Sequence, residues 1–406
     1  MKINVSKLKK YNQMHILAYE NELTDEQKYN LYNQINNIDF SYLDELTKQK
    51  ENKKVEISPI EAMTLSQIQE NYAQFEQIGL NALKNKEVGV LLLAGGMGTR
   101  LGSDNPKGMY NIGKTRDVFI FQRIFENLIE VVKKCGEKIP FFIMTSERND
   151  EITRKFLEEK NYFGYDKNYI SFFTQDMAPC TDFNGKILME AKDKIATSPN
   201  GNGGWFVSLL NNKQSKEMLE KFNLKWINIF SVDNVLQKMA DPVFVGATIK
   251  TNSQIGAKVI RKVDAYEKVG VMCKKNGRPS VIEYIDLGED MATLTNENGE
   301  RLYNYGVILN YLFSVDLLYR IKDCKMPTYV VTKKINHIDE NGNLIKPETP
   351  NGHKFETLNV DMIELGDTCL PFEVEREKEF APIKNKEGVD SVESAQALLE
   401  KNGYIL

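Results

Sequence analysis

Three short apolar segments, separated by helical patterns, restrict the fold of this chain more than any other feature. They span residues 88–94, 140–145 and 226–232, and the first contains no polar side chain. Apolar runs of this length, without alternation, are typical of strands that are buried on both faces of a parallel sheet. A helical pattern follows the first segment at residues 119–133. The sequence therefore predicts an α/β fold with a mainly parallel sheet.

The first part of the chain, residues 1–86, has the pattern of helices instead. Residues 24–27 have the spacing of a capping box, and apolar residues follow at helical intervals. Ser58, followed by Pro59, repeats the signal for a helix start. This second signal predicts one long helix that ends at about Lys84.

After about residue 256 the pattern becomes more β-like. Asn-Gly pairs at 276–277, 298–299 and 341–342 are hairpin-turn signals, and a final helix is predicted to begin near Ser391. Three consecutive regions are expected: a helical N-terminal region at 1–86, an α/β domain at 87–330 and a small C-terminal domain at 331–406.

Composition narrows the possible partners and sites. The 406 residues include 53 Lys and Arg against 57 Asp and Glu, a net charge of −4, which gives no reason to expect a nucleic-acid or membrane partner. The five cysteines and three histidines are scattered, so neither a disulfide framework nor a zinc site is expected. The sequence has no signal-peptide pattern and no apolar run of ~20 residues, so we expect a cytoplasmic protein. No protein partner is indicated.

A glycine-rich loop directly follows the first apolar segment, in the run LAGGMGTRLGSDNPK at residues 93–107. Gly95 and Gly96 allow backbone N–H groups to approach a polyphosphate, and Arg100 and Lys107 add positive charge on the same loop. A Walker A loop is not expected, because this run lacks a Gly-Lys-Ser/Thr triplet. The dinucleotide fingerprint fails at its third glycine, which argues against hydride transfer.

Asp233 follows the third apolar segment, so its carboxylate is expected at the carboxyl end of that strand. Ligands of open α/β sheets bind at this edge. Mg²⁺ is commonly held by one or two carboxylates together with substrate phosphates. Asp233 is therefore the best candidate for a Mg²⁺ ligand, with a helix N-cap as the alternative role.

Seven blocks, in order along the chain, resemble the UDP-N-acetylglucosamine pyrophosphorylase family. They are the glycine-rich run at 93–113, QDMAP at 175–179, SPNGNGG at 198–204, VDNVL at 232–236, VIEY at 281–284, the stretch at 355–361 and REKEFAPIKN at 376–385. The resemblance implies a Rossmann-like, GT-A-like nucleotidyltransferase core with a helical N-terminal region and a small C-terminal domain. It also implies an enzyme that joins UTP to a sugar 1-phosphate with release of pyrophosphate, the middle region being catalytic.

The resemblance also implies the roles of individual residues. UTP contacts are expected from Leu93, Ala94, Gly95, Gly96, Lys107, Gln175, Gly201, Asp233 and Lys384. Catalysis is expected from Arg100, Lys107 and Lys384, the last reaching the phosphates from the C-terminal region. Gln175 is expected to bind uracil, whose imide edge suits a side chain with both donor and acceptor. Asn202 and Glu283 are expected to hold the sugar.

The implied reaction needs no covalent intermediate, because a sugar 1-phosphate is already an anion and can attack the α-phosphorus of UTP directly. Catalysis then consists of aligning two anions and neutralising charge on the departing pyrophosphate. Cationic side chains, glycines and a Mg²⁺ ligand are the groups that this chemistry requires. Histidine-based general catalysis is not required, in agreement with three scattered histidines.

The sugar half of the pattern departs from the family. Leu358 and Val360 stand where the family has aromatic residues, and Val307 stands where it has an asparagine. N-acetylglucosamine 1-phosphate is the leading sugar substrate, and glucose 1-phosphate is the close alternative. A non-catalytic nucleotide-sugar-binding protein is the alternative of a different class. The retained charges, Arg100 among them, argue against it, because binding alone does not need all of them.

Overall fold

Two units, each assembled from three separate segments, make up the chain. The computed structural model describes residues 2–48 and 55–406. The smaller unit contains Met1–Lys54, Gln175–Trp205 and Lys325–Asn359, and the larger unit contains Val55–Thr174, Phe206–Cys324 and Val360–Leu406.

This division differs from the three consecutive regions 1–86, 87–330 and 331–406 that the sequence patterns predict. The chain leaves the larger unit twice and returns to it each time, so neither unit is a continuous stretch of sequence. Periodicity and turn signals report local structure, whereas a unit is defined by contacts between distant segments. The expected N-terminal region also includes residues 1 and 49–54, which lie outside the described residues.

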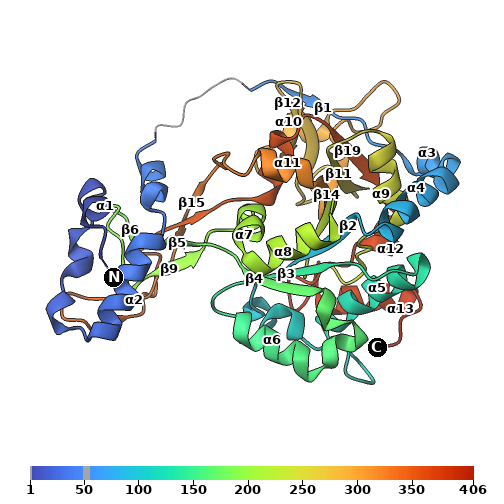
Figure 1. Ribbon diagram of the computed structural model, residues 1–406. Helices are drawn as coiled ribbons and strands as arrows, with labels where there is room; N and C mark the ends of the chain where they lie inside the picture. Colours follow the sequence, from blue (N-terminus) through green and yellow to red (C-terminus); the bar gives the residue numbers. More distant parts are fainter. Residues whose placement is uncertain (1, 49–54) are drawn as a thin grey trace. The chain divides into compact units, whose positions relative to one another are not determined.

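A ten-stranded sheet forms the centre of the larger unit (Figure 1). Four neighbouring strands are mutually parallel, in the order β10 (Trp226–Ser231), β2 (Val88–Leu93), β3 (Phe141–Thr145) and β4 (Ile170–Thr174). Every residue of β2 and β3 is buried, as expected for strands covered on both faces. The strands predicted from the three apolar segments are thereby confirmed.

Beyond β10 the sheet becomes mixed. β14 (Tyr305–Ser314) runs antiparallel to β10, and β11 (Ile255–Arg261) runs antiparallel to β14. β19 (Cys369–Glu373) is parallel to β11. β12 (Val271–Lys275) pairs with β14, β13 (Arg278–Ile282) and β1 (Ile57–Pro59). The α/β class is confirmed, with an antiparallel extension that follows the β-like pattern after residue 256.

Helices surround this sheet. They are α3 (Leu65–Glu70), α4 (Tyr72–Lys84), α5 (Ile120–Cys135), α6 (Asp150–Glu159), α7 (Trp205–Asn211), α8 (Lys213–Phe222), α9 (Pro242–Lys250), α10 (Gly288–Thr293), α11 (Val315–Arg320), α12 (Arg376–Glu379) and α13 (Val392–Lys401). α4 and α9 lie side by side (Figure 1), and glycines make this close approach possible. A Cβ atom on Gly79 would lie 1.9 Å from the Pro242 carbonyl oxygen. No helix among the described residues is long and apolar enough to cross a membrane.

The predicted helix start at Ser58 is wrong. Ser58 and Pro59 belong to β1, where they lie opposite Lys274 and Cys273 of β12. β1 is the outermost strand of the sheet, a position that tolerates proline because one side of the strand needs no backbone donor. The helix begins instead after Thr64, whose side chain forms a capping box with the third residue of α3.

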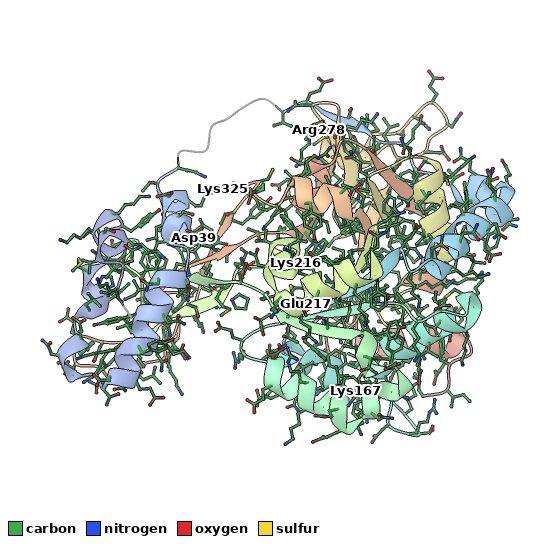
Figure 2. The ribbon with its side chains drawn as sticks, viewed as in Figure 1. Asp39, Lys167, Lys216, Glu217, Arg278 and Lys325 are labelled. Atoms are coloured by element: carbon green, nitrogen blue, oxygen red, sulfur yellow. The ribbon has the colours of Figure 1, made fainter. Side chains whose placement is uncertain are left out.

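The turn predictions have mixed outcomes. Asn276-Gly277 joins β12 to β13, and both residues have positive φ, which this turn requires. Figure 2 labels Arg278 at the start of β13, where its guanidinium binds Asp367 at 2.8 Å. The pair at 298–299 closes a turn spanned by a single bridge between Thr295 and Arg301 and not a full hairpin. The predicted helices at 119–133 and after Ser391 are confirmed by α5 and α13.

The smaller unit combines short helices with small sheets. Its elements are α1 (Val5–Lys10), α2 (Asp25–Asn37), β5 (Met177–Pro179), β6 (Thr181–Asp182), β7 (Met189–Ala191), β8 (Lys194–Ile195), β9 (Thr197–Pro199), β15 (Tyr329–Lys333), β16 (His337–Ile338), β17 (Leu344–Ile345) and β18 (Gly352–Glu356). The capping box predicted at 24–27 is confirmed at the start of α2. Leu31, Ile35 and Phe40 share one core with Ala178 and Phe355. The N-terminal helices therefore do not form a domain of their own.

Candidate nucleotide-binding site

The glycine-rich loop begins where two parallel strands end. Leu93, the last residue of β2, lies opposite Ser231 at the end of β10. Its carbonyl oxygen accepts a hydrogen bond from the Val232 N–H at 3.2 Å, and the Ala94 N–H donates to the Met144 carbonyl at 2.8 Å. The loop thus starts at the carboxyl edge of the sheet, the edge at which open α/β sheets bind ligands.

At Gly95 and Gly96 the loop leaves the backbone N–H groups free, while the carbonyl groups of residues 94–96 are bound. The carbonyl oxygens of Ala94 and Gly95 accept hydrogen bonds from Asn149 Nδ2 (2.9 Å) and Ser146 Oγ (3.1 Å). The Gly96 carbonyl accepts from the Lys107 N–H at 3.2 Å. Among the described residues, the N–H groups of Gly95 and Gly96 have no acceptor. Free N–H groups next to a strand end are suited to bind an anion.

Lys107 and Asp233 are 126 residues apart in sequence and form an ion pair at the same edge. Lys107 Nζ lies 2.6 Å from Asp233 Oδ1, and the two side chains are 12% and 33% exposed. Each group keeps capacity for a further ligand, because an ammonium has three donors and a carboxylate has two oxygens. The pair can therefore contact both a phosphate and a cation.

Arg100 lies on the exposed part of the loop, in the short 3-10 turn Thr99–Leu101. Within the part of the chain that the structure describes, its guanidinium makes no hydrogen bond or ion pair. The turn ends at Gly102, whose positive φ (75°) lets the chain reverse toward Lys107. An unpaired guanidinium on the loop is available to an incoming phosphate.

The segment that carries Lys384 lies beside Asp233. The Ile383 N–H donates to the Asp233 carbonyl oxygen at 2.8 Å. Lys384 itself closes a loop, since its Nζ lies 3.0 Å from Asp390 Oδ2 and its N–H donates to the Asp390 carbonyl. The structure thus brings the backbone next to Lys384 to the strand end that carries Asp233, with the Lys384 ammonium paired to Asp390.

Glu283 follows β13, and its half-buried carboxylate has no partner among the described residues. Burial raises the pKa of Glu283, and repulsion from Asp286 adds to the rise, against a smaller opposing effect of Lys275. Glu283 and Val307 both line the space next to Gly270, where a Cβ atom would lie 3.4 Å from Val307 Cγ2 and 3.5 Å from Glu283 Oε1. A half-buried carboxylate without a partner can accept hydrogen bonds from sugar hydroxyls.

The three other predicted residues, Gln175, Gly201 and Asn202, belong to the smaller unit. Gln175 is buried, with 9% of its surface exposed. Gly201 has φ 84° and pairs with Thr357, whose carbonyl oxygen would lie 2.2 Å from a Cβ atom at this position. The Asn202 amide oxygen accepts a hydrogen bond from the Asn359 N–H at 3.0 Å. Asn202 thus has a structural contact, and its amide nitrogen is left for a ligand.

A metal ion at this edge would depend on Asp233. Among the described residues no group of three His, Cys, Asp or Glu side chains has the arrangement of a metal site. A single carboxylate fits Mg²⁺, which keeps several waters and takes further oxygens from substrate phosphates. The donor set therefore fits a cation that arrives with a nucleotide and does not fit a site built wholly from protein ligands.

The glycine-rich run at 93–107 lacks the Walker A triplet, but residues 108–115 (GMYNIGKT), which directly follow it, match the Walker A pattern, so the prediction that no Walker A motif is present is wrong at the level of the sequence. The surroundings of this stretch differ from those of a Walker A loop, and its Lys and Thr side chains have other contacts. The pattern does not follow a strand, and Lys114 Nζ pairs with Glu400 at 2.9 Å. The Thr115 hydroxyl donates to the Leu406 carbonyl. The motif therefore contacts the C-terminal end of the chain.

Several residues that shape the site were not predicted from the sequence. Ser146 and Asn149 hold the carbonyl groups of the loop, and Asp390 binds Lys384. Ser146 and Asn149 follow β3 directly, so the rule that predicted Asp233 at a strand end could have found them. The position of Asp390 carries no comparable signal.

Comparisons with known proteins place these features in a family. A family model described as UTP–glucose-1-phosphate uridylyltransferase matches residues 37–405. UDP-N-acetylhexosamine pyrophosphorylase-like protein 1 of Homo sapiens is 37% identical over 330 residues, which are 79% of this chain and 65% of that protein. UDP-N-acetylglucosamine pyrophosphorylase of Saccharomyces cerevisiae is 39% identical over 351 residues, 82% of this chain and 72% of that protein.

A solved structure has the same fold. The crystal structure of the uridine diphosphate N-acetylglucosamine pyrophosphorylase from Trypanosoma brucei, in complex with inhibitor, matches with a TM-score of 0.83 at 26% identity. The match covers 97% of this chain and 83% of that chain. The predicted nucleotidyltransferase core is thereby confirmed.

Proposed function

Because the chain belongs to the UTP–glucose-1-phosphate uridylyltransferase family, we propose that it transfers uridylyl from UTP to N-acetylglucosamine 1-phosphate. The products are UDP-N-acetylglucosamine and pyrophosphate. The observation that carries the proposal is the Lys107–Asp233 pair, 2.6 Å apart, beside a loop with free N–H groups. This arrangement offers a phosphate-binding surface and a cation ligand at one edge of the sheet.

The reaction consists of one displacement at phosphorus. An oxygen of the sugar phosphate forms a bond to the α-phosphorus of UTP, and the bond from that phosphorus to the bridging oxygen of pyrophosphate breaks. Since the attacking oxygen already carries negative charge, no side chain has to remove a proton. The residues of the site contribute by orienting two anions and by neutralising charge on the leaving group.

The chain's own cations are assigned to the phosphates. The N–H groups of Gly95 and Gly96 and the side chains of Arg100 and Lys107 bind the triphosphate. Lys384 joins them from the segment that is hydrogen-bonded to Asp233. Its ammonium has three donors, so it can keep Asp390 and gain a phosphate oxygen.

A divalent cation is a general requirement of this class of enzyme, and we propose Mg²⁺ held by Asp233. When bound, Mg²⁺ neutralises negative charge on the phosphates and aligns them. Lys107, paired to one oxygen of Asp233, holds that carboxylate in place and leaves its second oxygen for the cation.

Recognition of the base and the sugar is assigned to four further residues. Gln175 is proposed to pair with the imide edge of uracil, and Gly201 to let the backbone pack against the base. Asn202, through its free amide nitrogen, and Glu283, through its unpartnered carboxylate, are proposed to bind sugar hydroxyls.

Glucose 1-phosphate is kept as the second candidate substrate on one observation. Val307 stands where the family resemblance expects an asparagine, and Val307 and Glu283 both line the space next to Gly270. An apolar side chain here cannot donate to the N-acetyl group. Discrimination by an apolar pocket is worth ~1–3 kcal/mol, or roughly 10–200-fold, so we expect a preference for the N-acetylated sugar within that range.

A coupled pyrophosphate-release assay with UTP and a panel of sugar 1-phosphates tests this proposal. We expect UTP-dependent release with N-acetylglucosamine 1-phosphate and a lower kcat/KM with glucose 1-phosphate. Equal values, or a preference for glucose, would overturn the sugar assignment alone. A protein that binds UDP-sugars but releases no pyrophosphate with any sugar phosphate would overturn the enzymatic proposal.

A further inference from the structure

Asn234, the residue after Asp233, joins two segments that lie 145 residues apart. Its side chain is 2% exposed. Its Nδ2 donates to the Glu379 carbonyl oxygen at 2.7 Å, and its Oδ1 accepts from the N–H groups of Ala381 (2.9 Å) and Leu236 (3.2 Å). Both ends of the amide are therefore bound, and two of these three bonds reach the segment before Lys384.

Backbone hydrogen bonds extend the same connection. The Ile383 N–H donates to the Asp233 carbonyl at 2.8 Å, and the Val235 N–H donates to the Ala381 carbonyl at 3.3 Å. Between them Asn234 lies opposite Pro382 in an antiparallel bridge. Proline has no N–H, so this short ladder lacks one backbone donor. The Asn234 side chain supplies hydrogen bonds that the ladder otherwise lacks.

The Glu379 side chain anchors the same segment to the central sheet. Its carboxylate pairs with Lys258 Nζ at 2.6 Å, and Lys258, on β11, is fully buried and also binds Asp241 at 2.9 Å. The segment therefore has one anchor in the sheet and a second at Asn234. Lys384 directly follows Ile383, the last residue of the segment that is hydrogen-bonded to Asp233.

We infer that Asn234 is a positioning residue for the reaction, which holds the segment carrying Lys384 in place beside Asp233. The inference rests on the proposed function, in which Lys384 contacts a phosphate. Because the Asn234 amide is buried and bound to protein groups at both its oxygen and its nitrogen, we place its action on Lys384 and not on the substrate. Misplacement of a reacting group by about 1 Å can lower a rate by ~10²-fold, so loss of this anchor is expected to lower kcat.

A double-mutant cycle between Asn234→Ala and Lys384→Ala tests this role. Asn234→Ala is expected to lower kcat by ~10–100-fold, with less than about a 3-fold change in KM for UTP. In the Lys384→Ala background the same substitution is expected to change kcat by less than about 3-fold, since the group through which it acts is gone.

Asn127→Ala is the matched control. Asn127 is also buried, and its Nδ2 binds the Val235 and Gln237 carbonyls at 3.2 and 3.0 Å, in the same loop as Asn234. None of its hydrogen bonds reaches residues 379–384 among those that the structure describes. Its effect on kcat is expected to be the same in both backgrounds. An Asn234→Ala effect that also stays the same in both backgrounds would overturn the inference.

Hydrogen exchange of the Ala381 and Ile383 amides provides a readout that does not depend on turnover. We expect faster exchange in Asn234→Ala than in the wild-type protein and no change in Asn127→Ala. Unchanged exchange in Asn234→Ala overturns the inference alone, whereas a wild-type protein without pyrophosphate release overturns the proposed function. If Asn234→Ala does not fold, Asn234→Asp replaces it, because it keeps the shape and the acceptor but turns an oxygen toward the Glu379 carbonyl.

Discussion

Lys107 is the residue on which the assignment of the phosphate site depends most. Its ammonium is paired to Asp233 and only 12% of its side chain is exposed. Lys107→Ala is expected to lower kcat/KM by ~10²–10³-fold, the scale for loss of one charge-stabilising donor, and Arg100→Ala by a similar factor. Steady-state kinetics gives the factor. Circular dichroism is expected to be unchanged, because both side chains belong to a loop.

Lys114 supplies the control for this prediction. It lies in the Walker A-like stretch, but its side chain is 43% exposed and pairs with Glu400. Lys114→Ala removes a surface ion pair and is expected to leave kcat/KM unchanged. Near wild-type turnover in Lys107→Ala would remove that lysine from the mechanism. A loss of turnover in Lys114→Ala would mean that the Walker A-like stretch, and not the glycine-rich loop, binds the phosphates.

Asp233 is the proposed protein ligand of the Mg²⁺ ion. Asp233→Asn keeps the size of the side chain and removes its charge, so the Mg²⁺ concentration that gives half-maximal activity is expected to rise by ~10-fold or more, equivalent to ~1.4 kcal/mol. A Mg²⁺ titration of pyrophosphate release measures this shift. The same half-saturation in variant and wild type would mean that Asp233 is not a ligand.

Glu283 is expected to lower the stability of the fold above its pKa. Its pKa is raised by burial from the ordinary value of 4.5, so the folded protein holds this proton more tightly than the unfolded chain does. The penalty is absent below the unfolded pKa and is fully present once the pH has risen through the folded pKa. Glu283→Gln is therefore expected to have the higher unfolding temperature at about pH 7.5, with the difference shrinking toward about pH 4.

The control for Glu283 is Glu297→Gln, which changes an exposed carboxylate in a turn. Thermal unfolding followed by circular dichroism across this pH range compares the variants. A Glu283→Gln midpoint that stays below the wild-type midpoint at neutral pH would show that the carboxylate has a stabilising partner.

Among the elements, alanine substitution is expected to have different effects at two glycines in turns: a loss of stability at Gly201 and a loss of UTP binding at Gly96. Gly201 has a positive φ and no room for a Cβ atom, whereas a Cβ atom on Gly96 would meet nothing within 4 Å. Gly201→Ala is expected to cost at least about 1–3 kcal/mol of stability. Gly96→Ala is expected to change stability by less than about 0.5 kcal/mol but to raise KM for UTP ~10-fold, since a methyl group hinders approach to the free N–H groups.

Denaturant unfolding and UTP kinetics together check this pair. Equal stability of the two variants would contradict the described backbone at Gly201. Unchanged UTP kinetics in Gly96→Ala would mean that the triphosphate does not approach that part of the loop.

Element prediction succeeded where the signal is local. Buried strands and capping boxes follow from neighbouring residues, and β2, β3, β10 and α2 were predicted for that reason. Ser58 shows the limit of such signals. The sequence around it has the pattern of a helix start, but pairing with β12, more than 200 residues away, turns it into an edge strand. A local signal cannot report a competing partner at that distance.

For the whole molecule, the sequence names candidate site residues one at a time but does not give their arrangement in space. Strand-end placement and family resemblance together indicated Lys107, Asp233 and Lys384. Lys107 and Asp233 form an ion pair, and the Asn234 amide anchors the segment that carries Lys384. Each of these contacts connects positions more than 100 residues apart. Gln175 and Asn202 belong to a unit assembled from three segments, which periodicity alone does not reveal. Such contacts arise from the folded topology and leave no local trace.

Phosphorus NMR of the protein with UTP, N-acetylglucosamine 1-phosphate and Mg²⁺ is the most direct test of uridylyl transfer, because it observes every phosphorus atom of the reaction. We expect the UTP and sugar-phosphate signals to decline together, while signals of a UDP-sugar and of pyrophosphate grow in equal amounts. Lys107→Ala is expected to slow this conversion by ~10²–10³-fold. Unchanged substrate signals with the wild-type protein, or the appearance of orthophosphate without a UDP-sugar, would contradict the assignment of uridylyl transfer to this site.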